Sequence, residues 1–200
     1  YIGGHSMNIN DYKKYTIFTI NNYPLKYRHY LRSLFLDNGI AQESGQISLT
    51  NPESIDISAF SNIDEQLKTC IEANDKSLAV FERWEYTKDY KYSALFSTDD
   101  FSRLCCEVEK NIPEFSNDKL PLFDNLSSPS YLKPDESIIL IKFNLKFEAI
   151  HPQTSEELLI RYPVVVALHQ KEQIVEIRFD SLKRVFMERT ESFYADLVQS

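Results

Sequence analysis

The sequence predicts an α+β fold, with one domain over residues 7–200 built on a mainly antiparallel sheet of six to eight strands. Three β-rich runs near the C-terminus are joined by connections so short that the runs must be antiparallel neighbours. Several earlier segments carry apolar residues at helical spacing. A three-stranded meander cannot bury its apolar face alone, so we expect three to four helices to pack mostly on one face of the sheet.

The first predicted elements are a strand and a helix. In residues 14–21, Tyr15, Ile17 and Thr19 alternate with Thr16, Phe18 and Ile20, a pattern that suits a strand covered on both faces. Pro24 suits a first helical turn, and the residues after it carry an apolar stripe, which predicts a helix over residues 24–37. Gly39 can adopt the left-handed conformation that ends a helix.

The middle of the chain predicts short strands, a helix and a hairpin. We expect strands at residues 46–50 and 54–59, followed by a helix over 61–74 that Ser61 caps. Residues 77–86 and 90–96 are interpreted as the two arms of a hairpin. Thr98 and the two aspartates after it then predict the start of a helix over 98–110.

Residues 111–136 differ from the rest of the chain because they show no periodicity. We interpret them as one long loop, since loops of this length are uncommon and are often functional. The loop also carries apolar residues, which indicates that it packs on a surface. Four prolines interrupt it: Pro113, Pro121, Pro129 and Pro134.

The last third predicts the three-stranded meander most clearly. Its strands are Ser137–Ala149, Glu156–Leu168 and Gln173–Asp180. Pro163 lies within the second strand, which indicates an edge, a bulge or a break at that point. Residues after the meander are interpreted as a helix. It has no evident cap, so we expect the chain to be the N-terminal part of a larger protein.

Residues 1–6 have the character of an expression-tag remnant and are left out of the fold prediction. No apolar run approaches the length needed to span a bilayer, so we expect no membrane partner. The cysteines Cys70, Cys105 and Cys106 form no disulfide framework, which favours a reducing cytoplasm. The use of Asn, Ile and Lys is typical of a prokaryotic, AT-rich genome.

Composition argues against several kinds of site. The chain has 4 glycines, too few and too scattered for a phosphate-binding loop or a dinucleotide turn. The histidines beyond residue 6 have no metal-ligand spacing. There is no nucleophile elbow. We therefore expect no metal and no cofactor, and we favour a chain that is not an enzyme.

Charge is unevenly distributed along a chain whose net charge is -8. The charged residues of 11–32 are all basic apart from Asp11, whereas acidic residues strongly outnumber basic ones in residues 35–80. We expect these two stretches either to face different partners or to face each other. An acidic chain repels a phosphate backbone in bulk, so nucleic acid is a disfavoured partner that would need a local basic patch.

The candidate binding residues come from two places. Residues 12–32 interleave tyrosines with basic residues, a pattern that suits an acidic protein surface or single-stranded nucleic acid. The loop over 111–136 adds apolar side chains. Together they provide the predicted partner-binding residues: Tyr23, Lys26, Arg28, His29, Arg32, Phe115, Leu122 and Phe123. The alternative is that the tyrosines belong to the core and the basic residues to a solvated helix face.

The sequence therefore predicts a non-catalytic recognition or interaction module. Its expected partner is a protein or the remainder of a larger chain, and a homo-oligomer is compatible with this interpretation. One alternative is a nucleic-acid specificity domain that directs a nuclease-type effector in restriction or phage defence. It requires Lys26, Arg28 and Arg32 to cluster on one exposed face. Another alternative is a metal-dependent hydrolase whose acidic residues come from distant segments.

Overall fold

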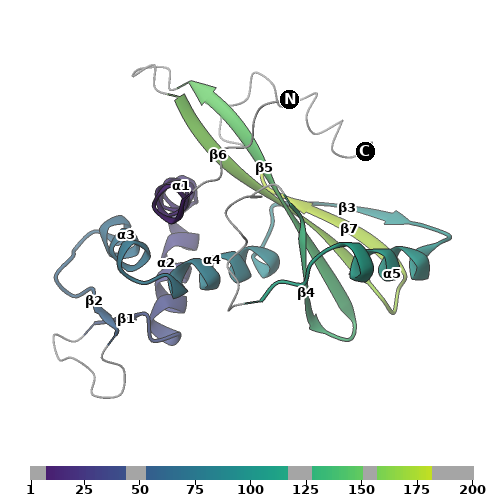
Figure 1. Ribbon diagram of the computed structural model, residues 1–200, viewed down its shortest axis with the longest axis horizontal. Coiled ribbons are helices and arrows are strands. Elements are labelled where there is room, and N and C mark those ends of the chain that lie inside the picture. The colour runs from purple at the N-terminus through teal and green to yellow at the C-terminus, as the bar shows by residue number, and fades with distance from the viewer. Residues whose placement is uncertain (1–7, 44–52, 117–127, 151–156, 182–200) are drawn as a thin grey trace. The chain divides into compact units, whose positions relative to one another are not determined.

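The computed structural model describes residues 8–43, 53–116, 128–150 and 157–181, which form an α+β fold (Figure 1). These residues hold five helices, a five-stranded antiparallel sheet and a pair of parallel strands. The prediction of six to eight strands in one sheet and three to four helices is therefore wrong in its numbers. The chain divides into two compact units, and each is described by itself.

The first unit, called the N-terminal unit, comprises residues 1–85 and 116–126. In its described part, four helices accompany the parallel strand pair, and the last helix ends two residues into the other unit. The elements are α1 (Ile9–Asn22), α2 (Leu25–Asp37), β1 (Ala41–Gln42), β2 (Ile55–Asp56), α3 (Ile63–Ala73) and α4 (Lys76–Thr87).

Helix α1 replaces the strand that was predicted over residues 14–21. Asn8 caps the helix by accepting a hydrogen bond from the backbone N–H of Asp11 at 3.0 Å. Tyr12, Tyr15 and Thr19 are buried at intervals of three and four residues, which is helical spacing. The strand prediction was wrong because a run with apolar residues at both alternating sets of positions also fits a buried helix, and periodicity alone does not separate the two.

Helix α4 replaces the first arm of the predicted hairpin. Leu78, Phe81 and Trp84 recur at every third position, and all three are buried. The second arm does form a strand, β3 (Tyr92–Ser97), but it pairs with β7 (Ile174–Phe179), a segment distant in sequence. The hairpin prediction was wrong because the aromatic residues within 77–86 also fit helical spacing, and the structure buries those that recur at every third position.

Helices α2 and α3 confirm the predictions for residues 24–37 and 61–74. The cap of α3 is Asn62 instead of Ser61: its side chain accepts a hydrogen bond from the N–H of Asp64 at 2.9 Å. Of the strand predicted at 54–59, Ile55–Asp56 is a strand. The strand predicted at 46–50 and the helix predicted at the C-terminus lie outside the described residues.

The buried thiol of Cys70 on α3 gives a direct test of packing in this unit. Burial raises the pKa of Cys70 to about 11, although nearby Arg32 acts in the opposite direction. At pH 8 only about one thiol in 1000 is then ionised, and the thiolate is the reactive form. We expect iodoacetamide to label exposed Cys106 in the folded chain and to leave Cys70 unmodified, as measured by peptide mass spectrometry. Equal labelling of both thiols without denaturant would contradict the packing of α3.

The second unit, called the sheet unit, comprises residues 86–115 and 127–200. Its sheet has the order β3-β7-β6-β5-β4, and the consecutive strands β5, β6 and β7 confirm the predicted meander. The remaining elements of the unit are α5 (Phe101–Asn111), β4 (Ser130–Asp135), β5 (Ile138–Ile150) and β6 (Glu157–His169).

Strand β4 lies inside the segment that was predicted to be one long loop, so that prediction is wrong for residues 130–135. Tyr131 pairs with Ile141 of β5, and the register shifts between Leu132 and Asp135. This bulge and the following proline remove the regular alternation by which a strand is recognised in a sequence. Residues 117–127 of the predicted loop lie outside the described residues.

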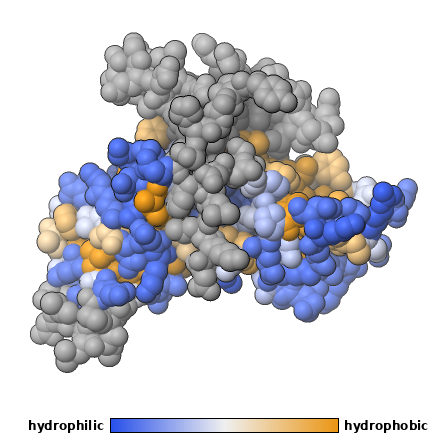
Figure 2. Space-filling model, in the orientation of Figure 1, coloured by the Kyte–Doolittle hydropathy of each residue, from blue (hydrophilic) through white to orange (hydrophobic). Residues whose placement is uncertain are grey.

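Different elements cover the two faces of the sheet. On one face, Phe101 and Val108 of α5 pack against Ile139, Ile141 and Leu168. Their neighbours along the strands point the other way and form a second cluster, in which Tyr86 and Phe115 pack against Leu132, Leu140, Val165 and Ala167. In this unit the covering elements therefore lie on both faces of the sheet, which differs from the prediction that they pack mostly on one face. Figure 2 shows hydrophilic residues on the outer side of α5 and apolar residues beside it.

A buried ion pair joins the segment after α4 to the end of β7. The Lys88 ammonium, whose side chain is fully buried, contacts the Asp180 carboxylate. Asp180 also accepts a hydrogen bond from the backbone N–H of Lys91 at 3.1 Å, and its carbonyl accepts one from the Tyr162 hydroxyl. The Lys88 ammonium lies 3.9 Å from the centre of the Tyr90 ring, a favourable cation–π position. These contacts tie the entry of β3 to the exit of β7.

Candidate interaction surface

Helix α2 has one side in the core and one side in solvent. Leu31 and Phe35 are buried. The residues that face outward are exposed and recur at intervals of three to four positions, which places them along one side of the helix. We call this set the α2 stripe: Leu25, Lys26, His29, Tyr30 and Ser33.

Two apolar side chains dominate the α2 stripe. Leu25 is 52% exposed and Tyr30 is 53% exposed. They are the large exposed hydrophobic residues of the described part of the N-terminal unit. A single exposed apolar residue is ordinary on a protein surface, but Tyr is also a residue type enriched at the energetic centres of interfaces.

Tyr30 rests on a cluster of aromatic rings. Its ring centre lies 6.4 Å from that of Trp84, and the Trp84 ring meets Tyr23 edge-on at 5.4 Å and Tyr27 at 5.7 Å. Phe81 completes the cluster, 6.0 Å from Trp84. Contacts of this geometry are favourable beyond the area they bury. Tyr30 thus packs against Trp84, which is itself buried, and a ring that is restricted in this way loses less conformational entropy when a partner binds.

Polar contacts fix the edges of this cluster. The Tyr23 hydroxyl donates a hydrogen bond to the Glu85 carboxylate at 2.9 Å. The Lys26 ammonium lies 4.5 Å from the centre of the Tyr27 ring. Lys26 is exposed, so its charge lies at the surface beside the two apolar side chains of the α2 stripe.

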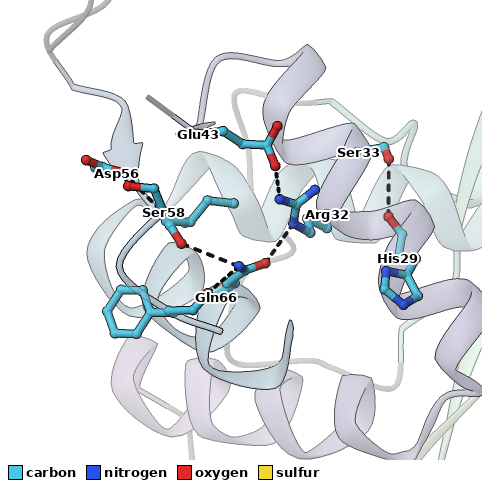
Figure 3. Close-up of polar contacts among 9 residues, drawn as sticks. His29, Arg32, Ser33, Glu43, Asp56, Ser58 and Gln66 are labelled. Atoms are coloured by element: carbon cyan, nitrogen blue, oxygen red, sulfur yellow. Dashed lines mark hydrogen bonds and ion pairs between the residues drawn. The ribbon is translucent and has the colours of Figure 1, made fainter. Parts of the chain in front are cut away.

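The two arginines of α2 point to acidic residues of the same unit. Arg28 Nη1 lies 2.5 Å from Asp64 Oδ1, at the start of α3. Arg32 contacts Glu43, and its Nε donates a hydrogen bond to Gln66 Oε1 at 2.7 Å (Figure 3). On α1, Lys13 Nζ lies 2.6 Å from Asp75. The basic stretch and the acidic stretch of the sequence therefore face each other, one of the two arrangements considered above.

His29 belongs to the exposed side of the helix. Its side chain points away from the network around Arg32, and its carbonyl oxygen accepts a hydrogen bond from the Ser33 hydroxyl at 3.3 Å (Figure 3). The imidazole is thus oriented toward solvent, one helical turn after Leu25 and Lys26.

The remaining predicted binding residues are not part of this surface. Phe115 belongs to the sheet unit, where its ring lies 5.4 Å from that of Tyr86 and its N–H donates to the Tyr131 carbonyl at 2.7 Å. Leu122 and Phe123 lie outside the described residues. Of the predicted binding residues, Lys26 and His29 lie on the exposed α2 stripe, and Tyr23 lies in the aromatic cluster beneath it. Arg28 and Arg32 face Asp64 and Glu43 instead, and Phe115 lies in a different unit.

The sequence prediction missed Leu25, Tyr30 and Trp84 as parts of this surface. Tyr30 belongs to the tyrosine-rich segment of residues 12–32 but is not one of the predicted binding residues. Trp84 was assigned to a strand, so its contact with α2 could not be anticipated. The signal was available in the spacing of Leu78, Phe81 and Trp84, which places Phe81 and Trp84 on adjoining positions of one helix face.

The described residues carry no group of three or more His, Cys, Asp or Glu side chains arranged to hold a metal ion. In the same part of the chain, no helix combines the length and apolar character needed to cross a membrane. No protein-family profile matches the sequence, and neither a curated protein nor a solved structure is significantly similar to it.

Proposed function

We propose that this chain is a non-catalytic recognition module that binds a protein partner through the α2 stripe. The observation that carries this proposal is the exposed Tyr30, held by the aromatic cluster beneath it and flanked by Leu25 and Lys26. An aromatic residue with a fixed position, an apolar neighbour and a cation at the rim has the composition of an interface centre. The complementary partner presents an apolar side chain next to carboxylates.

The ion pairs of α2 favour a protein partner over nucleic acid. Binding to a phosphate backbone draws on unpaired lysines and arginines. Arg28 and Arg32 are half-buried and already paired with Asp64 and Glu43, so Lys26 and His29 are the basic members that remain exposed on this helix. The condition set by the specificity-domain alternative, three basic residues on one exposed face, is not met by these arginines.

The proposal is tested by crosslinking from the position of Tyr30. The full chain carrying a photoreactive benzoylphenylalanine at residue 30 is irradiated in a lysate of its source, and the same probe at Leu104 on α5 serves as the matched control. A protein captured from position 30 and not from position 104 is then purified. Its binding to the unmodified chain is measured by calorimetry.

We expect Tyr30→Ala to weaken that binding by about tenfold or more, because truncating a central aromatic residue of an interface costs about 2 kcal/mol. Leu104→Ala should change it less than about twofold, as is usual for a residue outside the interface. Equal affinity of the Tyr30→Ala variant would overturn the proposal. So would tight, steeply salt-dependent binding to DNA or RNA in fluorescence anisotropy between about 50 and 200 mM salt, because that behaviour identifies phosphate contacts.

A further inference from the structure

The two edges of the five-stranded sheet differ in how they are protected. At one edge, β4 carries a bulge and Pro134, and Tyr131 makes an additional bridge to Glu114. At the other edge, β3 pairs with β7 on its inner side, and within the described residues no strand pairs with its outer side. Bulges, prolines and charges are the usual means of blocking an edge strand, because its unpaired N–H and C=O groups can accept another strand.

Strand β3 has none of these blocking features. It reads Tyr-Ser-Ala-Leu-Phe-Ser, without a charge, a proline or a glycine. Its large side chains are exposed: Leu95 by 66%, Tyr92 by 43% and Phe96 by 36%. An edge of this kind is suited to adding a strand.

We propose that β3 pairs with β3 of a second copy of this chain, so that two sheets join into one across a two-fold axis. This two-fold axis is perpendicular to the sheet and lies between the two β3 strands. Because directly opposite residues share a face, the axis must lie midway between the two copies of one residue, which then faces itself. With the axis at Ala94, Tyr92 of each copy lies opposite Phe96 of the other. This register forms two aromatic cross-strand pairs around a small central residue, an arrangement that stabilises antiparallel strands. On the opposite face, Leu95 lies opposite Ser93.

The charges at the ends of β3 favour a second copy as the occupant. Lys91 precedes the strand, Asp99 follows it, and both are exposed. In the antiparallel register centred on Ala94, Lys91 of one copy lies opposite Ser97 of the other, next to the turn that carries Asp99. A lysine side chain is long enough to reach a carboxylate of that turn, so two complementary pairs form by symmetry. Each copy supplies both members, which is the self-complementarity that a two-fold interface requires.

The proposal is independent of the partner proposed for the α2 stripe, because β3 belongs to the other unit. One short strand from each copy makes a small interface, and we therefore expect a reversible dimer with a dissociation constant in the micromolar range. The measurement is sedimentation equilibrium of the full chain at concentrations from about 1 to 300 µM, a span that covers such an affinity.

The first variant is Leu95→Lys, with Leu104→Lys as the matched control on α5. Leu95 is exposed and lies beside Glu176 of β7, so the substituted lysine has an acidic neighbour and the fold is expected to persist. In the dimer, the two lysines lie diagonal to each other on one face. Like charges placed this closely oppose association, and we expect Leu95→Lys to raise the dissociation constant by about tenfold or more. Leu104→Lys should change it by less than about twofold, because exposed positions outside an interface contribute little.

A second variant tests the register. In the double variant Ser93→Glu with Leu95→Lys, each new carboxylate lies opposite a new lysine of the other copy, and association should return to within about threefold of the original. A chain that remains monomeric over the whole concentration range would overturn the proposal, as would a dimer that Leu95→Lys leaves intact. A dimer that Leu95→Lys weakens but the double variant does not restore would overturn the register centred on Ala94.

Discussion

Replacing Lys88 with methionine is expected to lower the free energy of unfolding by about 3–5 kcal/mol, the usual effect of removing one member of a buried ion pair. The Lys88 side chain is fully buried against Asp180, whose own side chain is 23% exposed. Methionine fills a similar volume but leaves the Asp180 carboxylate without this ammonium partner in a poorly solvated position. The measurement is urea unfolding at pH 7, followed by circular dichroism.

Two further variants identify the cause of the loss. Lys171→Met makes the same chemical change on an exposed lysine of the same unit, and we expect it to alter stability by less than about 0.5 kcal/mol. The double variant Lys88→Met with Asp180→Leu removes both charges and should be more stable than Lys88→Met alone. A Lys88→Met chain as stable as the Lys171→Met chain would show that the ion pair contributes nothing.

The second large effect is expected for Phe81→Ala in the N-terminal unit. Phe81 is fully buried on α4 and lies 6.0 Å from Trp84 and 6.4 Å from Tyr23. Truncating a buried phenylalanine leaves a cavity and costs about 3–5 kcal/mol. The chain has one tryptophan, so fluorescence of Trp84 during denaturant unfolding reports on this unit specifically.

Tyr30→Ala is the matched variant for Phe81→Ala because both remove a ring that contacts the same tryptophan. Tyr30 is exposed, so its removal should cost less than about 1 kcal/mol of stability while it weakens binding through the α2 stripe by about tenfold or more. Phe81→Ala should instead lower both stability and binding. If the two variants destabilised the unit equally, Tyr30 would be part of the core and would not serve as a contact residue.

Several elements could be predicted from the sequence because their signals are local. Helix α2 is marked by Pro24 before it and Gly39 after it, and Gly39 has the positive φ of 66° that ends a helix. The first strand of the meander alternates apolar and polar residues, and its three strands are joined by short connections in the sequence, so neither their number nor their direction depends on distant residues. Local periodicity and turn chemistry were sufficient for these elements.

Other elements depend on contacts that a local pattern does not contain. The alternation in residues 14–21 fits a strand covered on both faces, but the burial of Tyr12, Tyr15 and Thr19 on one side selects a helix. The partner of β3 is β7, with α5, β4, β5 and β6 between them in the chain, and no local signal names it. A hairpin with the preceding residues was the nearest alternative available to a local argument.

The candidate surface was predictable in part. The tyrosine-rich basic segment was recognised, and the opposite charges of residues 11–32 and 35–80 allowed for mutual contact. The particular pairs, Arg28 with Asp64 and Arg32 with Glu43, arise from the packing of α2 beside α3 and β1. This packing decides which cations are engaged within the unit and which remain exposed. Composition alone therefore overstated the number of basic residues available to a partner.

The pairing of β3 with β7 has a consequence for the order of folding during synthesis. The ribosome releases β3 long before β7, because α5, β4, β5 and β6 are synthesised between them. Contacts distant in sequence require closure of a long loop and therefore form late, whereas the β5–β6–β7 meander is made of local hairpins. During this interval β3 has both edges unpaired. The nascent chain thus carries an uncharged strand open to wrong pairing, and arrival of Asp180 at Lys88 ends that interval.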